Sequence, residues 1–183
     1  GQFSMHMWTS ITVGFIFAFP FILWEIWKFI SPALYEKEKK YAASFIIISS
    51  ILFFIGVLFG YYLIAPLSVQ FFASYIVSPE ISNSIDIDSY MSLMKTSAIA
   101  SGLLFELPII IFFLTKIGLV TPEFLRKYRK YTLVVVLIVA AVITPPDVLS
   151  QIIVTIPIMI LYEASILISV LVVKSQEKEK LKA

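Results

Sequence analysis

The sequence predicts an all-α protein that crosses a membrane several times. Hydrophobic residues make up 60% of the 183-residue chain and charged residues only 14%, whereas a typical soluble domain has about 25% charged residues. The mean hydropathy is +0.96, and long apolar runs alternate with short charged segments. Because no polar or Gly/Ser-rich linker divides the chain, we expect residues 1–183 to form a single transmembrane domain.

Five apolar segments are expected to span the membrane, each as a helix that needs about 20 residues. They cover roughly residues 3–27, 41–67, 90–114, 131–144 and 148–173. Pro20, inside the first segment, predicts a bend rather than a helix end. In the second segment, Gly56 and Gly60 form a GxxxG pattern, which permits another helix to approach closely.

The fourth segment, residues 131–144, is unusually short. Its 14 residues form about 21 Å of helix, whereas the hydrocarbon core is about 30 Å thick. Two interpretations of residues 131–173 therefore remain open: two spans in a locally thinned bilayer, which we favour, or a re-entrant hairpin. Pro146 and Asp147 predict a tight turn between the two apolar segments.

The basic residues predict which loops face the cytoplasm. All 14 Lys and Arg residues except Lys95 fall on one side of the five predicted spans. The positive-inside rule places that side in the cytoplasm. The cytoplasmic segments are then about 28–40, about 115–130 and the tail 174–183, and the acidic loop at about 68–89 lies outside. Within the loop at about 115–130, Thr121 and Pro122 predict the start of a short basic helix on the membrane surface.

The beginning of the chain differs from a cleavable signal. Its first residues have no basic region, and the chain begins with Gly1 rather than an initiator methionine. We therefore expect the chain to be a fragment of a longer protein.

Carboxylates within the spans are candidate functional residues, because an ionised group in the middle of a bilayer costs on the order of 3 kcal/mol. Glu106 lies deep in the third span with no basic residue within a helical turn. It is either a polar foothold inside the bilayer for an incoming helix or peptide, or a structural group that is protonated or hydrogen-bonded to Gln151, Ser101 or another helix. Glu25 can pair with Lys28 three residues later. Glu163, in the last span, is expected to be structural.

The loop between the first two spans carries a further candidate, Glu38. Ser31 and Pro32 predict the N-cap and first residue of a helix. On such a helix Glu38 shares a face with Leu34, whereas Glu36 is rotated about 160° away from Glu38. Glu38 is therefore either an acid held against the apolar membrane surface or an ordinary solvated charge among neighbouring lysines.

The usual signatures of catalysis are missing from the sequence. It contains no HExxH, GxSxG or P-loop motif, no cysteine, and a single histidine, His6. Such motifs carry the chemistry of metalloenzymes, hydrolases and nucleotide-binding proteins. We therefore expect no enzymatic activity, no metal site and no cofactor.

Four segments in a fixed order point to one family. They are FPFILWEIWKFISPALYEKEKK, SGLLFELPI, TPEFLRKYRKY and ITPPDVLSQ. Together they resemble the TatC family, the polytopic subunit of the twin-arginine protein translocase, over essentially the whole chain. The resemblance implies a six-span, glove-shaped concave protein of a bacterial-type inner membrane. This chain would contain five of those spans and lack the N-terminal tail and the first span.

The resemblance also implies a signal-peptide site in the first cytoplasmic loop. Phe29, Pro32 and Glu38 match the positions of this site in the family. A carboxylate at Glu38 can bind an arginine guanidinium through bidentate, charge-assisted hydrogen bonds, which lysine cannot reproduce.

Two further groups of residues follow from the resemblance. Glu106 and Gln151 match polar positions that line the concave face and contact signal peptides or partner helices of TatA and TatB type, and we place Glu25 with them. Pro146 and Asp147 match the family's Pro-Asp turn after the fifth span.

The predicted function is therefore that of a non-enzymatic receptor and core subunit of this translocase. It would bind twin-arginine signal peptides of folded cargo proteins and assemble with TatA- or TatB-type single-span subunits in the bilayer. It would form homo- or hetero-oligomers, use the proton-motive force and bind no nucleic acid. The alternative is an ion- or proton-coupled small-solute transporter that uses Glu25, Glu106 and Glu163. A transporter of this kind predicts discontinuous helices and repeat symmetry, and we find no internal repeat.

Overall fold

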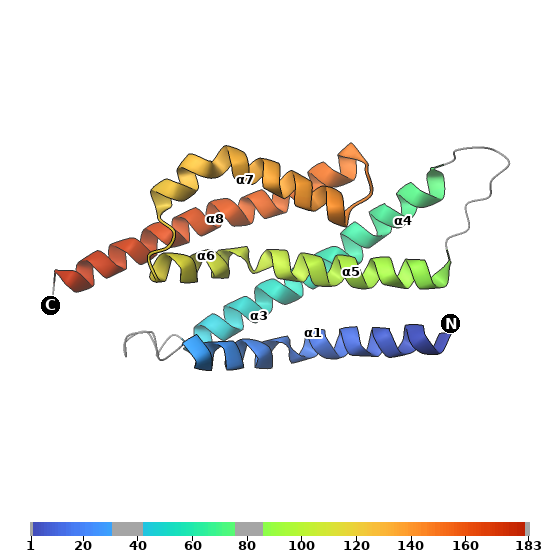
Figure 1. The fold of residues 1–183 in the computed structure, drawn as a ribbon, viewed down its shortest axis with the longest axis horizontal. Coiled ribbons are helices and arrows are strands. Elements are labelled where there is room, and N and C mark those ends of the chain that lie inside the picture. The colour runs from blue at the N-terminus through green and yellow to red at the C-terminus, as the bar shows by residue number, and fades with distance from the viewer. Residues whose placement is uncertain (1, 31–41, 76–85, 182–183) are drawn as a thin grey trace. The chain divides into compact units, whose positions relative to one another are not determined.

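The computed structural model describes residues 2–30, 42–75 and 86–181, and nearly all of these residues are helical (Figure 1). The helices are α1 (Gln2–Ile30), α3 (Ala42–Phe59), the π-helical turn η2 (Gly60–Ile64), α4 (Ala65–Ser74), α5 (Ile87–Phe105), α6 (Leu107–Lys116), α7 (Pro122–Ile143) and α8 (Val148–Lys180). No strand occurs within these three ranges. The all-α fold class predicted from the sequence is confirmed.

Within the described residues, four helical stretches are long and apolar enough to cross a membrane. They are Gln2–Phe29, Ser44–Ser74, Ile87–Lys116 and Val148–Lys178. The helix that contains Pro20 continues through this proline, as predicted. The second stretch runs to Ser74 because η2 joins α3 and α4 without interrupting the helical path.

The helix α7 combines two segments that the sequence analysis had separated. Its 22 residues begin at Pro122 and continue through the basic segment into the apolar one, as far as Ile143. The start follows the predicted pattern, because the Thr121 side chain accepts a hydrogen bond from the Phe124 N–H at 3.2 Å. Within α7 the composition changes from charged to apolar, but no proline or glycine ends the helix.

The chain divides into two compact units, Gly1–Leu103 and Leu104–Ala183. The first has a core made by three helices: α1 contributes Phe19 and Leu23, α3 contributes Phe53 and Val57, and α5 contributes Ala98. The rings of Phe19 and Phe53 stack with centroids 3.6 Å apart and planes 11° apart. This core holds α1, α3 and α5 together.

The second unit consists of the end of α5 and the helices α6, α7 and α8. Both α6 and α7 pack along α8 (Figure 1). The core combines Ile111 of α6, Leu125 of α7, and Tyr162 and Ile166 of α8. Gly118 enables the turn from α6 to α7, because its φ of 78° lies in the left-handed region that glycine favours.

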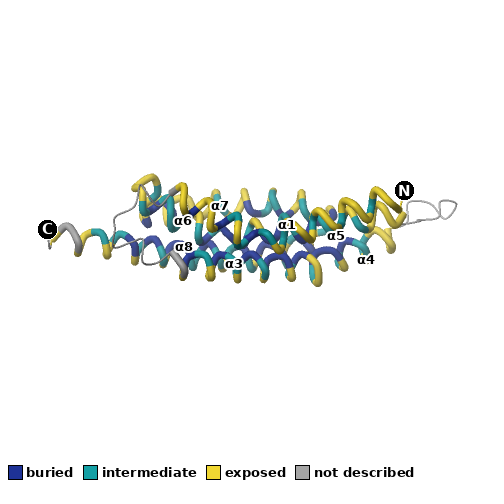
Figure 2. The backbone as a smooth tube through the Cα atoms, turned by 90° about the horizontal axis from the view of Figure 1, so that it is seen from below, coloured by how far each residue is buried: buried dark blue, intermediate teal, exposed yellow. Residues whose placement is uncertain are grey.

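The outward faces of the helices are apolar. Buried and exposed positions alternate along the helices (Figure 2). Many exposed side chains are large hydrophobic ones, including Ile160, Leu167 and Leu171 on α8 and Val142 on α7. In water such a surface would mark an interaction site, and in a bilayer it is the surface that faces lipid.

Candidate functional site

Glu106 lies at the junction between α5 and α6. The sequence analysis placed it within an unbroken helix, but the structure interrupts the helix at this residue. The cause is Pro108, which has no N–H to donate to the preceding turn and whose ring crowds the carbonyl of Leu104. The backbone carbonyl of Glu106 accepts hydrogen bonds from Ile109 and Ile110 at 2.9 and 3.0 Å. The residue is only 6% exposed, so its carboxyl group is buried at a break in a membrane helix.

Gln151 lies near the start of α8 and joins this helix to α7. Its Nε2 donates a hydrogen bond to the Leu137 carbonyl at 2.8 Å. Both Gln151 and Glu106 belong to the second unit, but no hydrogen bond joins them. The structural interpretation in which Gln151 satisfies Glu106 is therefore wrong.

Glu106 and Gln151 lie at different levels along the axis of α8, which explains why no hydrogen bond joins them. Thr115 of α6 shares a hydrogen bond with Ser169 of α8 at 2.9 Å, and the two helices follow the same direction. Glu106, nine residues before Thr115, is therefore level with about Ile160, and Gln151 lies about 13 Å nearer the start of α8 at 1.5 Å per residue. The two residues occupy different depths of the same unit.

The C-terminal end of α1 carries Glu25, Lys28 and Phe29. Glu25 and Lys28 form the predicted ion pair, with Lys28 Nζ 2.7 Å from Glu25 Oε1 and both side chains more than half exposed. Phe29 is 87% exposed, whereas its neighbour Trp27 is 7% exposed and lies against Phe45. Phe29 is thus more exposed than Trp24 and Trp27, the other aromatic residues at this end of α1. Pro32 and Glu38 lie outside the described residues.

Pro146 and Asp147 lie in the turn between α7 and α8. The Asp147 carboxylate accepts hydrogen bonds from the Ser150 N–H at 3.0 Å and from the Ser150 hydroxyl at 2.9 Å. Asp147 therefore caps the first turn of α8. The backbone hydrogen bond from Ser150 and then the hydroxyl hydrogen bond lower the pKa of this carboxyl group, because both stabilise its charged form.

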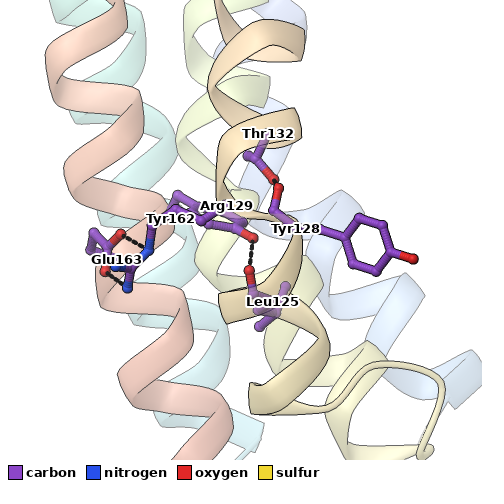
Figure 3. A network of polar contacts seen from close by, with 6 residues as sticks. All are labelled: Leu125, Tyr128, Arg129, Thr132, Tyr162 and Glu163. Carbon is purple, nitrogen blue, oxygen red and sulfur yellow. Dashed lines mark hydrogen bonds and ion pairs between the residues drawn. The ribbon is translucent and has the colours of Figure 1, made fainter.

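A bidentate ion pair joins α7 to α8 (Figure 3). Arg129 Nε lies 2.8 Å from Glu163 Oε1, and Arg129 Nη2 lies 2.8 Å from Glu163 Oε2. Beside it, the Tyr162 hydroxyl donates to the Leu125 carbonyl at 2.7 Å, and Tyr162 is 3% exposed. Two adjacent residues of α8 thus hold α7 in place.

The sequence analysis predicted the structural role of Glu163 in this ion pair but not its partner, Arg129. The sequence analysis expected Glu163 to be structural, and its ion pair with Arg129 supports that role. The partner was missed because it lies 34 residues away and was counted with the basic residues of the membrane surface. The available signal was the glutamate itself, because a carboxylate in an apolar helix requires a partner.

The described residues contain no cluster suited to a metal ion, since no group of three or more His, Cys, Asp or Glu side chains gathers within them. The polar groups of the second unit instead join one helix to another. Besides the contacts above, Gln176 Nε2 donates to the Lys116 carbonyl at 2.9 Å. These polar groups hold the helices of the second unit together.

Comparison with known families identifies the group to which this helical protein belongs. The family model described as Sec-independent protein translocase protein (TatC) matches residues 1–157. The chain belongs to the TatC family. The resemblance inferred from the sequence motifs is thereby confirmed, and the matches do not favour the small-solute transporter.

Individual relatives agree with this assignment. The chain is 45% identical over 176 residues to the TatC protein of Blattabacterium sp. subsp. Periplaneta americana, a match that covers 96% of this chain and 66% of that relative. It is 43% identical to TatCy of Bacillus subtilis, with 90% of this chain and 65% of that relative covered. The chain thus spans about two thirds of the length of these curated relatives.

A solved structure extends the similarity to three dimensions. The crystal structure of the twin arginine translocase receptor TatC has a TM-score of 0.75 and is 36% identical to this chain. The match covers 94% of this chain and 76% of the crystallised one. The fold is therefore that of a polytopic helical membrane protein of the TatC family.

Proposed function

We propose that this chain is the core of the receptor subunit of a twin-arginine translocase and is not an enzyme. The observation that supports the proposal is the family match over residues 1–157, together with the structural similarity to a twin arginine translocase receptor. The subunit would bind signal peptides of folded cargo proteins and use the proton-motive force for their transport. It would act as part of a homo- or hetero-oligomer.

The proposed signal-peptide site consists of Phe29, Pro32 and Glu38. Phe29 is fully helical and exposed at the end of α1, where the chain enters the loop that carries the other two residues. An exposed aromatic side chain can pack against the apolar part of an arginine side chain or stack on its guanidinium. Glu38 would then bind the guanidinium itself through two charge-assisted hydrogen bonds.

Glu106, Gln151 and Glu25 are proposed to contact the signal peptide or partner helices of TatA and TatB type at separate levels. Glu106 is a buried carboxyl group at a helix break, and an incoming polar group could use it as a foothold inside the bilayer. Gln151 holds α8 to α7 near the turn formed by Pro146 and Asp147. It would therefore fix the relative position of α7 and α8, and with it the surface against which a partner helix packs.

The proposed membrane topology follows the distribution of charge. The segments 28–40, 115–130 and 174–183 would face the cytoplasm of a bacterial-type cell, and the segment 68–89 would lie outside. The membrane would then be the inner membrane, crossed by the five segments predicted from the sequence. This orientation places Phe29 and Glu38 where newly made cargo is found.

The test uses the full-length protein and signal peptides that carry either Arg-Arg or Lys-Lys. Glu38→Gln should reduce photocrosslinking to the Arg-Arg peptide by about tenfold, because a charge-assisted hydrogen bond contributes roughly 1.5–3 kcal/mol and 1.4 kcal/mol corresponds to a factor of ten. The matched control is Glu36→Gln, which removes the same charge two residues away. Equal crosslinking by the wild type and Glu38→Gln, at equal protein abundance, would contradict the assignment.

A further inference from the structure

A groove of about 590 Å³ opens between α1 and α5 in the first unit. It is lined by Trp8 and Thr12 of α1 and by Ser92, Lys95, Thr96, Ile99, Ala100 and Leu103 of α5. The lining changes along α5, because the hydroxyl groups and the amine lie toward the start of the helix and the apolar side chains follow them. A groove with one polar end and one apolar end suits an amphiphile.

Lys95 is an unusual residue in this position. It is the only Lys or Arg in the 75 residues between Lys40 and Lys116, and it lies eight residues after the start of α5, about 12 Å along the helix. Among the residues that the structure describes, no carboxylate lies within ion-pair distance of Lys95. A cation in an apolar helix is costly without a partner, so the groove offers a positive charge to an external anion.

The dimensions of the groove match one leaflet of a bilayer. From Ser92 to Leu103 the helix rises about 16 Å, and half of the hydrocarbon core is about 15 Å. Trp8 lines the groove, and tryptophan is enriched at the level of lipid headgroups. A free phosphate ion would leave the side chains of Ile99 and Leu103 uncovered.

We propose that this groove binds one anionic phospholipid. The lipid phosphate would accept hydrogen bonds from Lys95 and from the neighbouring hydroxyl groups of Ser92 and Thr96, and an acyl chain would cover Ile99 and Leu103. A net negative headgroup is preferred over a zwitterionic one because its phosphate charge is not offset by an amine. The inference does not depend on the proposed translocase function, since its test measures lipid binding alone.

The test measures quenching of Trp8 fluorescence in the full-length protein by lipids with brominated acyl chains. In all samples Trp24, Trp27 and any tryptophan of the full-length protein outside residues 1–183 are replaced by Phe, so that the signal comes from Trp8. Brominated phosphatidylglycerol should bind about fivefold more strongly than brominated phosphatidylcholine, the effect expected of one lysine near an anionic headgroup. Lys95→Gln should reduce this ratio to about one, and Lys95→Arg should preserve it because the charge remains.

The controls separate the groove from general effects of charge and folding. Lys28→Gln removes a positive charge at the other end of α1 and should leave the lipid preference unchanged. An unchanged Trp8 emission maximum in phosphatidylcholine shows that Lys95→Gln remains folded. The proposal is overturned if the wild type shows no preference, if Lys95→Gln keeps it, or if neither lipid quenches Trp8 because another part of the full-length chain covers the groove.

Discussion

Glycine residues determine how closely the helices of the first unit approach one another. A Cβ atom added at Gly60 would collide with the Ser97 carbonyl oxygen and lie 2.8 Å from the Ala98 Cα, and these atoms are backbone atoms that cannot rotate away. A Cβ atom added at Gly14 would meet no atom within 4 Å. Both glycines are helical, so they form a matched pair that differs in packing.

Gly60→Ala should therefore destabilise the protein by about 1–3 kcal/mol, because an added methyl group forces the packed backbones apart. Gly14→Ala should leave stability unchanged or raise it slightly, since alanine is the better helix former. Unfolding of the two variants in mild detergent, followed by circular dichroism against denaturant concentration, measures both effects. Similar unfolding curves for the two variants would show that the close approach at Gly60 is not needed for stability.

The residues that need a distant partner show where prediction from the sequence ends. The GxxxG pattern of Gly56 and Gly60 predicts that a helix can approach, but not that the partner is Ser97 of α5. Asp147 differs from these glycines, because its neighbouring prolines predict the turn in which it lies. Its pairing with Ser150 is local, and the short S/T/D capping pattern could have predicted it.

At the scale of helices, polar side chains hold the second unit together. The helix α8 is joined to α7 through Glu163, Tyr162 and Gln151 and to α6 through Ser169 and Gln176. In a bilayer the hydrophobic effect gives little attraction between helices, because lipid tails are as apolar as leucine. Packing and interhelical hydrogen bonds therefore contribute a large share of the association.

A double-mutant cycle on Arg129 and Glu163 tests this role. We expect Arg129→Gln and Glu163→Gln to be coupled by roughly 1 kcal/mol, within the range of about 0.6–1.7 kcal/mol found for interhelical hydrogen bonds in membranes. The measurement is the free energy of unfolding of the wild type, both single variants and the double variant. The matched control cycle combines Arg126→Gln with Glu163→Gln. Arg126 lies on the same helix as Arg129, and its substitution should show no coupling with that of Glu163. Additive effects in the first cycle would contradict the proposed role.

Local signals predicted where helices begin better than where they continue. Thr121 and Pro122 correctly predicted the start of α7, because capping depends on adjacent residues. The change from charged to apolar residues after Lys130 suggested that one helix ends there and another begins, but α7 continues through this point. A change in composition does not by itself end a helix, and Arg129 is accommodated because it pairs with Glu163. The break at Glu106 could have been predicted from Pro108 two residues later.

At the scale of the whole molecule, the order of the sequence motifs was more informative than any single one. It correctly indicated the TatC family, which the match over residues 1–157 shows. The number of spans and the membrane orientation rest instead on apolar length and on the distribution of Lys and Arg. These two properties lead to a test that needs no signal peptide or partner protein.

The proposed orientation predicts which single cysteines a membrane-impermeant maleimide can reach. Residues 1–183 contain no cysteine, and any cysteine of the full-length protein outside them is replaced by Ser, so that each introduced thiol is the only target. Ser89, near the start of α5, and Ser175, near the end of α8, are both exposed. In intact cells from which the outer membrane has been removed, Ser89→Cys should be labelled and Ser175→Cys should be labelled only after the membrane is made permeable. Denatured samples of both variants, labelled to completion, serve as the control. If intact cells show the reverse pattern, the basic loops face outward, and if they label both sites equally, the two residues do not lie on opposite sides.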